Sequence, residues 1–116
     1  MKYKVVLVPF PFDDFSSTKV RPAVCLTEPI STFGHIIIAF ITSKMPIDIL
    51  PTDIVVDNSS LSTFYQTGLQ VTSIIRMHKL TTIPTSLIKR ELGQIPWELQ
   101  PAIDKALIKL FSLQRV

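Results

Sequence analysis

Apolar residues along most of this chain fall in short runs separated by turn-forming residues, a pattern typical of β-strands. These runs predict strands over residues 5–8, 21–27, 35–43, 54–57, 69–78 and 80–83. Prolines, glycines and stretches rich in serine and threonine lie between them, where the chain is expected to turn. The run Ile36-Ile37-Ile38 is continuous rather than alternating, which predicts a strand buried on both faces.

The C-terminal part of the chain changes to a helical period. Residues 86–93 are ambiguous, and we expect a short helix that gives way to a strand near 92–95. An amphipathic helix follows, with Pro101 in its first turn; its apolar face repeats at helical spacing through Ile103, Ala106, Leu107, Leu110 and Phe111. Trp97 is expected to hold this helix against the strands. The pattern predicts a mainly β fold, a small β-barrel with a C-terminal helix, in one domain over 1–116.

Composition limits the possible classes of protein. A chain of 116 residues can bury one core without disulfides or metal. Its one cysteine, Cys25, has apolar neighbours and is expected to be an inert core residue, which suits a reduced, cytoplasmic protein. With two histidines and no Cys/His cluster, we expect no metal and no cofactor. No apolar run is long enough to suggest a secretory leader or a membrane partner.

Positive charge is concentrated in the second half of the chain. Residues 1–60 hold five Lys/Arg and six Asp/Glu, whereas residues 61–116 hold seven and three. This distribution suits a polyanionic partner, but a solvated basic face without a ligand would look the same.

Polar residues at two strand ends are the candidate site. Arg21 opens one predicted strand, and Thr42-Ser43 closes another. A strand end holds its backbone rigidly while the side chain projects outward, which suits binding or catalysis. Two structural explanations stay open: Arg21 pairs with Asp13 or Asp14, and Thr42 caps its strand.

Six segments, taken in order along the chain, resemble the MazF/PemK family of toxin endoribonucleases: residues 6–12, 19–24, 41–43, 68–69, 73–76 and 87–93. The resemblance implies an SH3-like barrel that forms a homodimer and binds a cognate antitoxin. It also implies metal-independent cleavage of single-stranded RNA. In that family the ribose 2′-hydroxyl attacks the adjacent phosphate, which leaves a 2′,3′-cyclic phosphate and a 5′-hydroxyl.

The resemblance also assigns roles to individual residues. Arg21 matches the catalytic arginine, whose planar fork can hold two phosphate oxygens. Thr42 matches the catalytic hydroxyl, and Ser43 beside it is expected to help bind RNA. Arg76 matches a second basic position, and the residue two places later is commonly aspartate in the family. Here it is His78, whose imidazole either serves as general acid or base or is a neutral substitution at the rim.

Further residues are expected to contact RNA without reacting. Lys19 lies in a matched segment, and Phe15 offers a ring on which a base can stack. Lys79 is expected to contact phosphates, although it shares with Lys89 and Arg90 the alternative of a solvated surface.

Two other readings stay open. A CcdB-like toxin would share the barrel but poison a topoisomerase by protein contact, without cleaving any bond. An inactive relative would keep antitoxin binding alone, which suits His78 and the Tyr3-Lys4 that stands where the family usually has Gly-Asp. Arg21 together with Thr42 favours the nuclease, because a pure protein binder has no need of them.

Overall fold

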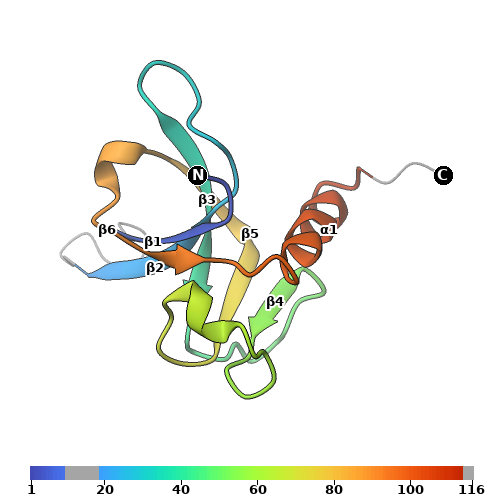
Figure 1. The fold of residues 1–116 in the computed structure, drawn as a ribbon. Helices are drawn as coiled ribbons and strands as arrows, with labels where there is room; N and C mark the ends of the chain where they lie inside the picture. Colours follow the sequence, from blue (N-terminus) through green and yellow to red (C-terminus); the bar gives the residue numbers. More distant parts are fainter. Residues whose placement is uncertain (10–18, 114–116) are drawn as a thin grey trace.

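A computed structural model describes residues 1–9 and 19–113 as a bent antiparallel sheet with one helix beside it (Figure 1). The sheet has the order β4-β5-β3-β2-β1-β6 and forms a half-barrel. The helix α1 lies against β4 and β5. In the part of the chain described, the elements are β1 (Lys4–Pro9), β2 (Val20–Cys25), β3 (His35–Thr42), β4 (Asp53–Val56), the 3-10 turn η1 (Phe64–Thr67), β5 (Ser73–Pro84), the 3-10 turn η2 (Thr85–Leu87), β6 (Arg90–Gln94) and α1 (Gln100–Leu110).

The predicted mainly β fold with a C-terminal helix is confirmed, with one error in the strands. The two strands predicted over 69–78 and 80–83 are one long strand, β5. Its pairing with β3 is irregular: Ala39 lies opposite Leu80, but the next residue, Phe40, lies opposite Arg76. Three residues of β5 therefore bulge at this point, and the bulge breaks the apolar pattern without ending the strand. None of the helices in the described residues is long and apolar enough to cross a membrane.

The core lies on both faces of the sheet, as predicted for β3. Ile36 and Ile38 belong to one buried cluster, and Ala39 and Ile41 belong to a larger one on the other face. Cys25 is fully buried in the first cluster, as expected, and desolvation raises the pKa of its thiol to about 11.

The C-terminal helix is attached differently from the prediction. Trp97 is 75 % exposed, so it does not hold the helix against the strands. Ile103 and Ala106 on α1 supply the contact with the core instead, together with a hydrogen bond of 2.7 Å from the Tyr3 hydroxyl to Asp104 Oδ1. Pro101 does lie in the first turn. Phe111 lies beyond the last helical residue and is exposed.

Two glycines bring the segment around η1 against β6. Gly68 ends η1 with φ of 71°, in the left-handed region that favours glycine. A Cβ on Gly68 would lie 2.1 Å from the Leu92 carbonyl oxygen, and one on Gly93 would lie 2.2 Å from the Gln66 carbonyl oxygen. The two backbones touch, which fixes the position of the loop 68–72 that follows.

Candidate functional site

A groove of about 500 Å³ lies at the end of the half-barrel where β1, β2, β3 and β6 face the loop after η1. Five strands contribute residues to it, and residues 68–71 together with Ser73, the first residue of β5, form one wall. The Ser73 hydroxyl donates a hydrogen bond of 2.8 Å to the Val71 carbonyl, which shapes this wall. The close backbone packing of Gly68 therefore positions one side of the groove.

Arg21 and Thr42 both line this groove, although they come from different strands. The register between β2 and β3 pairs Ala23 with Phe40. Continued by two residues, the same register puts Arg21 opposite Thr42, so the two side chains leave the same face of the sheet. Both residues are half-buried. The structure thus brings together the pair that the sequence singled out, along with Ser43, which is exposed in the same groove.

The hydroxyl of Thr42 is available as a hydrogen-bond donor. Its oxygen accepts the backbone N–H of Lys44 at 3.1 Å. That bond uses a lone pair and leaves the hydroxyl proton free, because a hydroxyl can accept and donate at the same time. The proton is available for an oxygen of a bound ligand.

The lining of the groove carries positive charge. Arg21, Lys44 and Arg90 all contribute to it, and within residues 1–9 and 19–113 the lining has no acidic side chain. None of the three forms an ion pair with another described residue. Asp13 and Asp14, the alternative partners of Arg21, lie outside the described residues. Uncompensated cations in a concave site attract anions, phosphates in particular.

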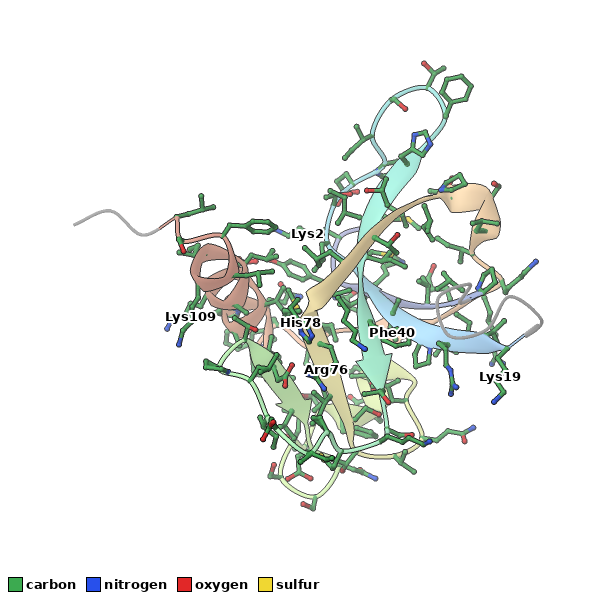
Figure 2. The ribbon with its side chains drawn as sticks, turned by 180° about the vertical axis from the view of Figure 1, so that it is seen from behind. Lys2, Lys19, Phe40, Arg76, His78 and Lys109 are labelled. Atoms are coloured by element: carbon green, nitrogen blue, oxygen red, sulfur yellow. The ribbon has the colours of Figure 1, made fainter. Side chains whose placement is uncertain are left out.

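Arg76 and His78 lie on β5, near Phe40 of β3, and the described lining of the groove includes neither (Figure 2). Arg76 Nε is 2.9 Å from Asp53 Oδ1, and the two side chains are 14 % and 0 % exposed. The N–H does not point at that oxygen, so the contact is an ion pair rather than a directed hydrogen bond. The second Asp53 oxygen accepts the Leu50 N–H at 2.8 Å. His78 is exposed.

The other expected RNA contacts are placed unevenly. Lys79 also lies outside the described lining, but its ammonium is 5.6 Å from the centre of the Phe40 ring, which does line the groove. Lys19 is exposed next to the start of β2 (Figure 2). Phe15 lies outside the described residues.

Sequence reasoning gave too little weight to Arg90 and did not single out Lys44 or Gln70, all of which line the groove. The sequence leaves Arg90 open between a phosphate contact and a solvated surface, as it does for Lys79 and Lys89. Its place in the groove follows from the pairing of β6 with β1, which joins residues more than eighty positions apart. The basic pair at 89–90 was the available signal, but only the register shows which of the two faces the groove.

The sequence matches the family model described as "PemK-like, MazF-like toxin of type II toxin-antitoxin system" over residues 1–111. The fold is similar to the Mycobacterium tuberculosis toxin MazF-mt6, with a TM-score of 0.72 and 23 % identity over 97 % of this chain and 99 % of that one. The fold is similar also to that of a mycobacterial endoribonuclease in complex with its cognate antitoxin, with a TM-score of 0.72 and 13 % identity. This similarity covers 100 % of this chain and 98 % of that one. Comparison with curated proteins gave no match.

Proposed function

This chain belongs to the family of PemK-like, MazF-like toxins of type II toxin–antitoxin systems, and we propose that it is an endoribonuclease that cleaves single-stranded RNA without a metal. One observation carries the proposal. Arg21 and Thr42, from separate strands, line one groove whose described lining has three cations and no acidic residue.

In the proposed reaction a ribose 2′-hydroxyl gives its proton to water as its oxygen attacks the adjacent phosphorus. The bond from phosphorus to the 5′-oxygen breaks, and that oxygen takes up a proton from water. The products are a 2′,3′-cyclic phosphate and a 5′-hydroxyl. Negative charge grows on the phosphate oxygens on the way to the transition state. Arg21 stabilises that charge with two parallel N–H donors, and the Thr42 hydroxyl donates a hydrogen bond to a phosphate oxygen. Because a guanidinium is always protonated and a threonine hydroxyl is neutral, both roles are electrostatic rather than acid–base.

The roles of Arg76 and His78 need a different assignment. Arg76 is held by a buried carboxylate, so we assign it to the stability of the β4–β5 pair rather than to the reaction. His78 is exposed outside the described lining, so we expect no proton transfer through it. An imidazole that transfers a proton makes the rate depend on pH near neutrality. Equal pH–rate profiles from pH 5.5 to 8 for wild type and His78→Ala would agree with this assignment, and a changed profile would contradict it.

The test of the proposed function uses purified protein, single-stranded RNA and EDTA, with analysis of the product ends. We expect cyclic phosphate and 5′-hydroxyl ends from wild type. Removing one charge-stabilising donor by Arg21→Ala should lower kcat about a hundredfold to a thousandfold. Thr42→Val keeps the shape of the side chain and removes the hydroxyl, so it should also lower kcat. Wild type that leaves RNA intact, or an Arg21→Ala variant with full activity, would refute the proposal.

The family and the groove also suggest partners. A solved relative is bound to its cognate antitoxin, and we propose that an antitoxin of this protein covers the groove and blocks RNA. We propose a homodimer as well, which light scattering would contradict by giving a mass of 13.1 kDa. Growth inhibition by wild type without any RNA cleavage would favour topoisomerase poisoning instead.

A further inference from the structure

We infer that Arg90 binds the phosphate of a nucleotide next to the cleaved one and thereby positions the RNA in the groove. This inference rests on the proposed function. Arg90 is exposed at the first residue of β6 and lines the same groove as Arg21.

The sheet places the two arginines on opposite sides of β1. Leu7 pairs with Pro22 on one neighbouring strand and with Arg90 on the other. Residues opposite one another in an antiparallel sheet share a face, so Arg90 lies on the face of Pro22, two strand spacings away, or about 10 Å. Arg21, the neighbour of Pro22, projects from the opposite face of the sheet, together with Thr42, because successive side chains of a strand alternate. The two arginines therefore reach the groove at this end of the half-barrel from opposite faces and two strand spacings apart, which suits two phosphates better than one.

The charge of Arg90 is not used elsewhere among the described residues. The nearest acid in sequence, Glu91, pairs with Val6 in the register and holds Lys4 Nζ at 2.6 Å. Glu91 is therefore already neutralised on the other face. Arg90 has no ion pair with any described residue, so an anion in the groove is its available partner.

Lys89 provides a matched control. It is adjacent, exposed and equally charged, but it does not line the groove, and its backbone N–H is hydrogen-bonded to the Leu7 carbonyl. A general effect of net charge on nucleic-acid binding would appear equally in Lys89 and Arg90 variants. A phosphate contact in the groove would appear in Arg90 variants alone.

The experiment measures the affinity for a single-stranded 2′-deoxy oligonucleotide, which keeps the phosphates and lacks the attacking hydroxyl, as a function of salt concentration. Arg90→Gln should bind about tenfold more weakly than wild type. The slope of log K against log salt should become shallower by about 0.7, the value for one phosphate contact on a single strand. Lys89→Gln should keep the wild-type slope. Arg90→Lys retains the charge, so its slope should be close to that of the wild type. Thermal unfolding of each variant verifies that β6 is intact.

Cleavage kinetics distinguish positioning from catalysis. Arg90→Gln should raise KM for RNA and leave kcat close to wild type, whereas Arg21→Ala should lower kcat. Equal salt-dependence slopes for Arg90→Gln and Lys89→Gln would overturn the inference about Arg90. The proposed function would still stand in that case if the wild type cleaves RNA. A lower kcat at unchanged KM for Arg90→Gln would also overturn it. Wild type that neither binds nor cleaves would overturn both.

Discussion

The buried pair between Asp53 and Arg76 offers a sharp test of how this fold is stabilised. The Asp53 side chain is completely buried and Arg76 is 14 % exposed, with 2.9 Å between Nε and Oδ1. Removing one member of a buried pair leaves the other charge uncompensated and costs about 3–5 kcal/mol. Because Arg76 keeps some contact with water, we expect the lower end, about 3 kcal/mol, for Asp53→Asn. In a chain of this size such a loss lowers Tm by about 12 °C.

The substitution separates charge from hydrogen bonding. Asp53 also accepts the Leu50 N–H at 2.8 Å, and an asparagine oxygen can take over that bond. Arg76→Met removes the guanidinium and should cost a similar amount, because it leaves a buried carboxylate alone. The double variant removes both charges, so its loss should fall short of the summed single losses by at least about 1 kcal/mol.

Urea unfolding of the four proteins measures this coupling. Additive single losses, or Asp53→Asn within about 0.5 kcal/mol of wild type, would refute the reasoning. Cleavage per folded molecule gives a second readout. Arg76→Met should keep kcat, because Arg76 is outside the described lining of the groove. A hundredfold loss of kcat in folded Arg76→Met would show that Arg76 acts on RNA, as the family resemblance first implied.

Three more predictions concern the parts that surround the groove. Gly93→Ala would place a Cβ 2.2 Å from the Gln66 carbonyl oxygen, so we expect a loss of about 2 kcal/mol in urea unfolding; unchanged stability would show that the contact relaxes freely. Burial keeps the pKa of Cys25 at about 11 against an ordinary 9.0, so a thiol reagent at pH 8 should label the protein in urea but leave the folded protein unlabelled. Burial, followed by the hydrogen bond to Asp104, raises the pKa of Tyr3 above 10.0. The protonated Tyr3 hydroxyl therefore stabilises the fold fully below pH 10, and this stabilisation is lost as the pH rises beyond 10. Tyr3→Phe should lower the free energy of unfolding by about 1 kcal/mol at pH 7 and reduce its decline at alkaline pH. An unchanged decline at alkaline pH would contradict this.

Local pattern was enough to predict most elements of this fold. The continuous apolar run of β3 indicated burial on both faces, and the repeat from Ile103 indicated the terminal helix. Local pattern failed where the outcome depends on partners distant in sequence. The bulge of β5 lies where its pairing with β3 changes from one register to another. In the sequence alone this point appears only as an interruption of the apolar pattern. Trp97 lies in the turn before α1 and is exposed; an aromatic residue at such a place can face either the core or solvent, and its own segment does not decide which.

The placement of Arg21 and Thr42 in one groove was predictable to the extent that it rests on strand ends. Arg21 and Thr42 stood out because each is a polar residue where a strand begins or ends, and the β2–β3 register carries both to one face. Arg76 lies inside its strand, as the fourth of the twelve residues of β5, and β4 supplies a buried carboxylate directly opposite it. Whether an arginine lines the groove or pairs with a buried carboxylate therefore depends on the neighbouring strand, not on the arginine's own segment.

The same reasoning explains why the groove is positive. Three acids of the described chain are matched away from the groove: Glu91 with Lys4, Asp104 with Tyr3 and Lys2, and Asp53 with Arg76. The cations that line the groove have no such partner among the described residues, so their charge is uncompensated there. A phosphodiester entering the groove would meet donors that need not break an existing ion pair to bind it. Binding should then weaken steeply with salt, because counterions alone compete for these side chains.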